Sequence, residues 1–302
     1  MSNQEIVLYR YSIVKEILKF LNKDETDLIS FVNRKIRRMI WNYSLNNYYF
    51  LTLDVNEKDR LKIKNFHSIT SSPKEIQETF PHLERLIIGN IPDNEMDISP
   101  LSSFHELTHL SVIAKISERI ILPPKITHLR MHLSDHGIPL PDFPKGLKYL
   151  EILTKQNIDN LPDSIIYLDI VSLKGIKINK YPGSLKYLFI GRCNQDITNL
   201  PKELISLGIF DHLSNFKVEL HEGLKYLMYF NLLDKYPKSL VYLVPPIGLR
   251  QERIDKIMNQ VGEHLEIYDT NFVYDEYGDL TGYKGRLYSA QDTYMSLFNS
   301  PF

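Results

Sequence analysis

The stretch YPGSLKYLFIGRCNQDITNLPKELISLGIF, residues 181–210, decides how the chain folds. It contains one pattern twice: a proline followed by three apolar residues three, six and eight positions later. The first copy is Pro182, Leu185, Leu188 and Ile190, and the second is Pro201, Leu204, Leu207 and Ile209. The two copies lie about 20 residues apart, so the stretch holds one full unit of a repeat and the opening of the next.

The frame L-x-x-L-x-hydrophobic can be read nine times between Leu83 and Leu243. Its anchor leucines are Leu86, Leu110, Leu129, Leu150, Leu168, Leu188, Leu207, Leu227 and Leu243. This frame and period are typical of leucine-rich repeats, in which stacked units share one core. Alternate side chains of a strand point to opposite faces, so the fourth and sixth positions fill the core and the third, fifth and seventh face outward. The sequence therefore predicts an α/β leucine-rich-repeat solenoid with a parallel, concave β-sheet.

A proline precedes most of the frames, as at Pro81, Pro124, Pro144, Pro162, Pro182, Pro201 and Pro237. Proline fixes its own φ and has no backbone N–H to donate, which disfavours a regular helix at these points. We therefore expect an irregular convex side, built of extended or turn-like segments.

Four segments follow from this pattern: a helical segment over 1–45, a transition with the first strands over 46–82, repeats over 83–244 and a cap over 245–302. The transition contains two short alternating runs, 48–55 and 61–66, and a helix start at 71–75 with a serine cap and a proline. The α+β cap should comprise a helix over 250–261, a strand over 265–268 and a hairpin around 277–283.

An aromatic column is predicted on the concave face. The residues predicted to bind a protein partner there are Tyr149, Tyr167, Tyr187, Phe189, Phe210, Tyr226, Met228, Phe230 and Tyr242. Rigid, amphipathic tyrosines suit a protein-binding patch. The alternative is a structural ladder, in which stacked tyrosines support one another across strands. Both interpretations stay open at this stage, since a ladder can also bind.

Composition and charge exclude several classes of function. A net charge of -1 gives no general attraction to nucleic acid or to an anionic membrane surface. The N-terminus lacks a secretory signal, and no apolar run is long enough to span a membrane. A single cysteine cannot form an internal disulfide, which favours a reducing, cytoplasmic setting.

The sequence predicts no enzyme, no cofactor and no metal site. Cys193 stands where leucine-rich repeats carry a small polar residue that turns inward, so we interpret it as structural rather than as a ligase nucleophile. His109 and His128 occupy the same position of neighbouring units and should stack, with His132 nearby. Three imidazoles can hold a metal, but no acidic or cysteine partner stands at matching spacing.

The first segment resembles a short F-box. IVKEIL at 13–18, DL at 27–28 and VNR at 32–34 match the family's Leu-Pro-x-Glu-Ile-Leu, Asp-Leu and Val-Cys-Arg, with Val14 in place of the proline. The resemblance implies docking to a Skp-type adaptor of a cullin ligase through Ile13, Ile17, Leu18 and Leu28. Alternatively, the two amphipathic helices predicted over 13–41 only cap the first repeat.

The repeats themselves resemble FNIP repeats. CNQDITNLPKEL at 193–204 and QNIDNLPDSI at 156–165 are similar to that family's Phe-Asn-x-Pro-Ile and Leu-Pro-x-Ser-Leu core. F-box proteins with FNIP repeats occur in amoebae and in the large DNA viruses that infect them, which implies a cytoplasmic protein, in the host cytoplasm if viral. The resemblance implies a substrate-recruiting subunit of a Skp/cullin/F-box ubiquitin ligase, with an unknown protein substrate on the concave face. The alternative is a non-catalytic scaffold.

Overall fold

The computed structural model describes residues 60–68, 71–89, 97–114, 119–133, 138–172, 175–191, 195–209, 216–229, 231–245, 250–267, 271–274 and 280–284. The F-box-like segment, 1–45, lies outside them, as does the first alternating run of the transition, 48–55.

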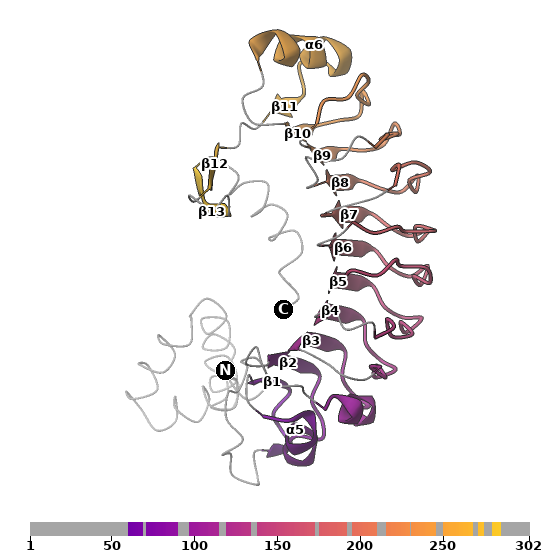
Figure 1. The fold of residues 1–302 in the computed structure, drawn as a ribbon, viewed down its shortest axis with the longest axis vertical. Coiled ribbons are helices and arrows are strands. Elements are labelled where there is room, and N and C mark those ends of the chain that lie inside the picture. Colours follow the sequence, from indigo (N-terminus) through magenta and orange to yellow (C-terminus); the bar gives the residue numbers. More distant parts are fainter. Residues whose placement is uncertain are drawn as a thin grey trace, which may run out of the picture.

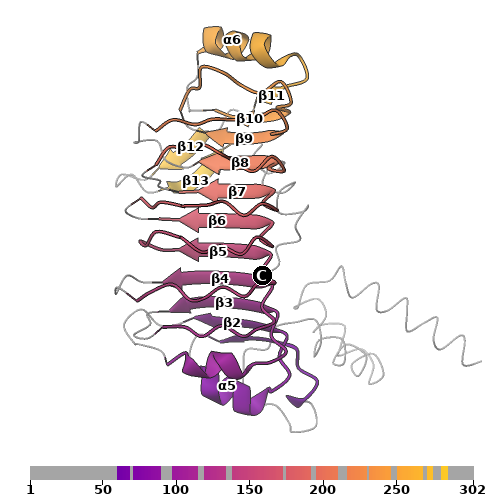
Figure 2. The same ribbon diagram turned by 90° about the vertical axis from the view of Figure 1, so that its right-hand side faces the viewer.

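Eleven strands of the described residues form one sheet, and all of them run parallel in the order of the chain. They are β1 (Asn65–Ser68), β2 (Arg85–Gly89), β3 (His109–Ala114), β4 (His128–Leu133), β5 (Tyr149–Leu153), β6 (Tyr167–Val171), β7 (Tyr187–Ile190), β8 (Ser206–Ile209), β9 (Tyr226–Tyr229), β10 (Tyr242–Val244) and β11 (Glu266–Ile267). The strands line the inner side of an arc and the connecting loops form its outer side (Figure 1). Figure 2 shows the strands stacked as successive rungs. The predicted leucine-rich-repeat solenoid is thereby confirmed.

The repeat places its leucines in the core as predicted. The anchor leucines pair in register, with Leu188 of β7 opposite Leu168 of β6 and Leu207 of β8. These side chains are almost completely buried, and the residue two positions later is buried beside them, as Ile190 is. On β5, β6, β7 and β9 the third and fifth positions of the frame are half-buried between these core residues. The alternation confirms that the third and fifth positions lie on the concave face.

A forked hydrogen bond joins each unit to the one before it. The carbonyl oxygen at the second position of a frame accepts the N–H groups of the second and third positions of the next frame. Thus Lys148 O accepts from Ile166 N at 2.8 Å and from Tyr167 N at 3.1 Å. The same fork recurs from Lys64 O, between β1 and β2, to Lys225 O, between β9 and β10. It fixes the backbone immediately before each third position.

The proline-leucine segments form turns, as expected. Leu185 N donates to Pro182 O at 3.2 Å and Leu204 N donates to Pro201 O at 3.0 Å, so each segment closes from its first to its fourth residue. The serine of the Leu-Pro-x-Ser-Leu pattern then ties one turn to the turn before it. Ser164 Oγ lies 2.6 Å from Lys145 O and 2.7 Å from Leu147 O. The irregular convex side is therefore internally hydrogen-bonded.

The two ends of the array carry helices. Near the first strands, α5 (Pro73–Thr79) begins with a capping box in which Ser72 and Glu75 exchange hydrogen bonds, and a 3-10 helix, η1 (Ser99–Ser103), follows β2. Beyond β10, α6 (Gln251–Val261) packs Ile257 and Val261 into the core cluster. A separate antiparallel hairpin joins β12 (Asn271–Tyr274) and β13 (Leu280–Lys284). The helix starts agree with the sequence pattern, and the hairpin overlaps its predicted range of 277–283 but begins earlier, at Asn271.

One prediction was wrong in its position. The second alternating run of the transition, 61–66, was expected to be a strand, but β1 begins only at Asn65. Leu61 is 60% exposed, whereas Ile63 and Phe66 are fully buried. Phe66 pairs in register with Leu86, so Ile63-x-x-Phe66 is an additional unit whose anchor is phenylalanine. The buried positions of this run therefore follow the repeat frame, in which the first and fourth residues are buried, rather than a two-residue alternation.

Replacing Leu188 by alanine should destabilise the array strongly. The side chain is completely buried between two neighbouring units, and truncation leaves a cavity. We expect the free energy of unfolding to fall by about 2–5 kcal/mol, measured by urea denaturation followed by circular dichroism. Lys186→Ala, at an exposed position of the same unit, should change it by less than about 0.5 kcal/mol. Equal losses in the two variants would contradict the repeat frame.

Candidate protein-binding face

The third frame positions form one row across the concave face. Register places them on consecutive strands: Arg85, His109, His128, Tyr149, Tyr167, Tyr187, Ser206, Tyr226 and Tyr242. Phe189 and Met228 lie on the same face at fifth positions. Of the predicted partner-binding residues, Phe210 and Phe230 lie outside the described residues. The structure brings the other seven together on one surface.

Ring stacking orders the first half of this row. The rings of His109 and His128 lie 4.0 Å apart at 9°, and those of His128 and Tyr149 lie 4.2 Å apart at 10°. Tyr149 and Tyr167 follow at 6.2 Å, and Tyr226 stacks on Tyr242 at 5.1 Å and 6°. The predicted stacking of the two histidines is confirmed. Stacked rings thus form a ladder over His109, His128 and Tyr149 and a second stacked pair at Tyr226 and Tyr242.

Strand β8 interrupts the row with two small residues. Ser206 and Gly208 are both buried, because neighbouring side chains cover them. A Cβ atom at Gly208 would lie only 2.4 Å from Phe189 Cδ1, so the phenylalanine ring rests directly on the glycine. The absence of a side chain at Gly208 therefore gives Phe189 its place. Sequence reasoning missed this role, although a glycine at a fifth position next to a phenylalanine was readable from the frame.

A charged cluster sits beside the stacked rings. At the fifth positions of β4, β5 and β6 lie Arg130, Glu151 and Asp169, in register on adjacent strands. Arg130 Nε is 2.8 Å from Glu151 Oε1, and His132 Nε2 approaches the same oxygen at 3.5 Å. Sequence reasoning did not select these residues, because it ranked the face by aromatic content alone.

Burial keeps the stacked histidines neutral. It lowers the pKa of His109 to about 3, helped by the charges of His128 and Arg85. It lowers the pKa of His128 to about 4, helped by Arg85 and Lys148. The hydroxyl groups of Thr108 and Thr127 lie 2.8 and 2.9 Å from the Nδ1 atoms of His109 and His128. Both rings therefore act at neutral pH as uncharged members of the aromatic ladder.

The pKa of Asp169 is raised, in contrast to the lowered pKa values of the two histidines. Burial and then the neighbouring Glu151 carboxylate raise the pKa of Asp169 to about 7, against the opposing effects of Arg130, His132 and a hydrogen bond from Tyr167. Burial likewise raises the pKa of the Tyr167 hydroxyl. A carboxyl group that changes charge near neutral pH thus lies in the middle of the face.

No group of three or more metal-ligating side chains is assembled within the described residues. His132 contacts Glu151 instead of joining the stacked pair of imidazoles. Cys193, the cysteine that we interpreted as structural, lies outside the described residues. The helices that the structure describes include none with the length and apolarity to cross a membrane.

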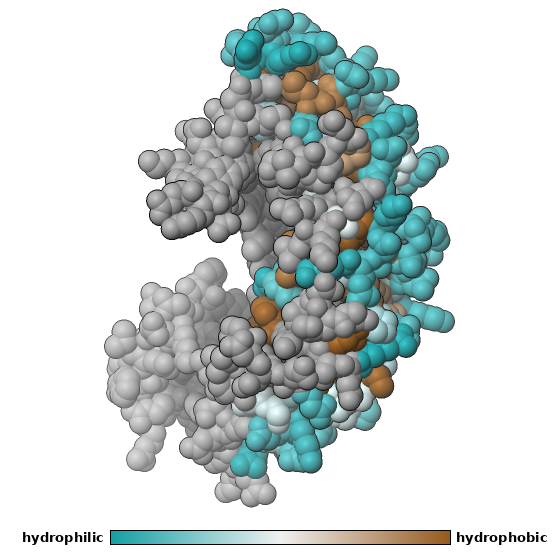
Figure 3. Space-filling view, in the orientation of Figure 1, coloured by the Kyte–Doolittle hydropathy of each residue, from teal (hydrophilic) through white to brown (hydrophobic). Residues whose placement is uncertain are grey.

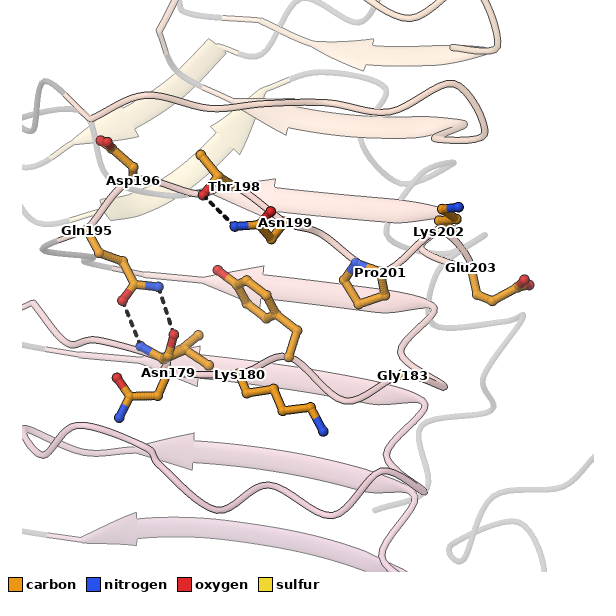
Figure 4. Close-up of a pocket in the computed structure, with 12 residues that line it drawn as sticks. Asn179, Lys180, Gly183, Gln195, Asp196, Thr198, Asn199, Pro201, Lys202 and Glu203 are labelled. Carbon is orange, nitrogen blue, oxygen red and sulfur yellow. Dashed lines mark hydrogen bonds between the residues drawn. The ribbon is translucent and has the colours of Figure 1, made fainter.

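A hollow of about 730 Å³ lies between the segment that precedes β7 and the segment that precedes β8, lined by residues such as Lys180, Asp196 and Lys202 (Figure 4). Its polar groups mainly join one unit to the next. The Gln195 amide donates to Ile178 O and accepts from Ile178 N, both at 3.0 Å. Asn199 adopts a positive φ of 56° in the turn before Pro201. We interpret this hollow as a seam between repeats.

The outer side of the arc is predominantly hydrophilic (Figure 3).

The fold and this face together define a leucine-rich-repeat solenoid. Comparison with models of protein families found no match, and neither did comparison with curated proteins. Among solved structures, the chain is similar to YopM from Yersinia enterocolitica WA-314, with a TM-score of 0.42 and 17% sequence identity. The match covers 69% of this chain and 50% of the YopM chain, so it spans half the length of that protein.

Replacing His128 by tyrosine should make the protein more resistant to acid. The pKa of His128 is lower in the folded chain than in the unfolded one. Its contribution to the free energy of unfolding is therefore fully present above about pH 6.5 and is lost as the pH falls toward 4. Tyrosine continues the ring ladder without titrating there. We expect the variant to lose about 1–2 kcal/mol less stability between pH 7 and pH 4.5, measured by urea denaturation at both values.

His105→Tyr, at an exposed position, provides the matched control and should lose as much stability in acid as the unmodified chain. Neither His128 nor His105 is among the groups that shift the pKa of Asp169, so we expect the titration of Asp169 to cancel in the comparison. Identical acid sensitivity of His128→Tyr and the control would refute the neutral-histidine interpretation.

Proposed function

We propose that this chain is a protein-interaction module that binds a partner on the concave face of its solenoid. The observation that carries the proposal is the row of half-buried aromatic rings, aligned across adjacent strands by the sheet. Tyrosine offers a large contact area with few rotatable bonds, so the side chains of this face would lose little conformational entropy when a partner binds. The charged cluster at the centre adds the polar specificity that a purely apolar patch lacks.

For the cellular role, we favour the substrate-recruiting subunit of a Skp/cullin/F-box ubiquitin ligase. The support is the resemblance of residues 13–34 to an F-box and of the repeats to FNIP repeats. The mechanism would be proximity: the solenoid holds a protein substrate beside a ligase and raises its effective concentration, with no chemistry of its own. The second candidate is a non-catalytic scaffold whose N-terminal helices only cap the first repeat, which a solenoid end requires.

Replacing both Tyr187 and Tyr226 by alanine should lower the affinity for the partner at least about tenfold. These rings flank the small residues of β8, and aromatic truncation at the centre of an interface typically costs more than 1 kcal/mol per residue. Affinity capture from a eukaryotic cytosol, followed by titration of the recovered partner, measures the effect. Lys186→Ala with Lys225→Ala, at the exposed second positions of the same two units, is the control. Equal retention by both double variants would exclude the concave face as the binding surface.

The ligase role predicts direct binding of a purified Skp-type adaptor to the intact chain. Ile17→Asp with Leu18→Asp should abolish that binding, because charged side chains cannot enter an apolar docking groove. A pull-down with both forms tests this, and circular dichroism checks that both stay folded. Failure of the intact chain to bind would remove the ligase role and leave the scaffold.

A further inference from the structure

The charged cluster on the concave face contains more negative than positive charge. Arg130 and His132, both on β4, approach the same oxygen of Glu151, at 2.8 and 3.5 Å. Asp169 stands one strand further along, in register with Glu151. The cluster thus contains two carboxylates and one guanidinium, and one negative charge is left uncompensated when all three groups are ionised.

Asp169 is the carboxylate left without a cation. It accepts a hydrogen bond from the Tyr167 hydroxyl, but within the described residues it forms no ion pair. Burial and the negative charge of Glu151 both disfavour the ionised form of Asp169, and they raise its pKa to about 7. A cation placed beside it would relieve both effects, because an opposite charge favours the ionised carboxylate.

Two aromatic residues are neighbours of this carboxylate on the concave face. Tyr167 precedes it on the same face, and Phe189 is its register partner on β7. The ring centroids of Tyr167 and Phe189 lie 5.7 Å apart, with an angle of 39° between the ring planes. The ring centroid of Tyr149 lies 6.2 Å from that of Tyr167. Ring faces attract cations, and the aliphatic part of a long basic side chain packs well on aromatic surfaces. Val171, 42% exposed at the next position of the face, extends the apolar surface.

We propose that Asp169 anchors a lysine or arginine side chain of the protein that binds the concave face. This inference rests on the proposed protein-binding function and specifies the chemistry of the partner. Charge complementarity argues for it: an acidic side chain would meet Glu151 and Asp169 as like charges, and a neutral one would bury Asp169 without compensation. The aromatic rings hold the stem of the basic residue while the carboxylate pairs with its charged end.

Selection of a random peptide library on the purified full-length chain tests the proposal. Each selected peptide is then synthesised in two forms, one natural and one with its lysine replaced by norleucine or its arginine by citrulline. Their affinities at pH 8 are measured by fluorescence anisotropy for the unmodified chain, Asp169→Asn and Asp163→Asn. Asparagine keeps an oxygen that accepts from Tyr167, and Asp163 is a largely exposed outer carboxylate, so its variant matches the change in charge.

We expect the selected peptides to share a lysine or arginine. Its neutral replacement should weaken binding to the unmodified chain at least about tenfold, as should Asp169→Asn toward the natural peptide. The two changes together should cost little more than either alone, because both remove the same pair. Asp163→Asn should bind like the unmodified chain.

Two results would overturn the inference in distinguishable ways. Peptides that lose affinity for Tyr187→Ala with Tyr226→Ala, yet are insensitive to Asp169→Asn, would keep the concave face as the binding surface and remove the basic anchor. A selection that returns no peptide, or only peptides indifferent to both variants, would overturn the proposed protein-binding function along with the anchor.

Discussion

The fork of two N–H groups on one carbonyl is the interaction on which the rest of the structure depends. It occurs at each junction from β1 to β10, and it ties the second and third frame positions of one unit to the second position of the unit before. A single unit has too little apolar surface to stay folded, so this link and the shared leucine core must form together. A one-residue shift of register would move every leucine of a strand to the wrong face.

The same fork gives the concave face its order. Because it holds the backbone just before each third position, the rings at those positions recur with the spacing of the strands, about 4.8 Å. Near-parallel contacts of 4.0 and 4.2 Å between the rings of His109, His128 and Tyr149 follow from this geometry. The ladder and the proposed binding surface therefore consist of the same rings: stacking keeps them rigid, and rigid rings would bind a partner with little loss of entropy.

Much of the fold could be predicted, because its determinants are local and repeated. The frame positions identify the core leucines, the concave row and the turn at each proline, and helical spacing identifies α6 through Ile257 and Val261. Strand β1 was misplaced, because Phe66 replaces the leucine that marks a unit. The contact between Phe189 and Gly208 depends on a side-chain conformation across two units, which periodicity does not specify.

The site was predictable in outline but not in its electrostatics. The frame places Arg130, Glu151 and Asp169 side by side, and this much was readable before the structure. What the pattern does not contain is that Arg130 pairs with Glu151, while Asp169 is buried beside the Glu151 carboxylate without an ion pair among the described residues. Burial and partner choice are set by side chains on three strands at once, so they emerge only when the units are stacked.

The C-terminal end of the sheet explains why the array stops growing. An exposed parallel edge would offer unpaired N–H and C=O groups to the edge of another molecule. Here β11 has only two residues, and α6 beyond β10 covers the end of the core with Ile257 and Val261. Gln260 fastens this helix, donating to Asp234 O and accepting from Tyr236 N. At this end the described residues thus offer only a two-residue edge and a helix over the core, so little backbone is left for a further strand to extend the sheet.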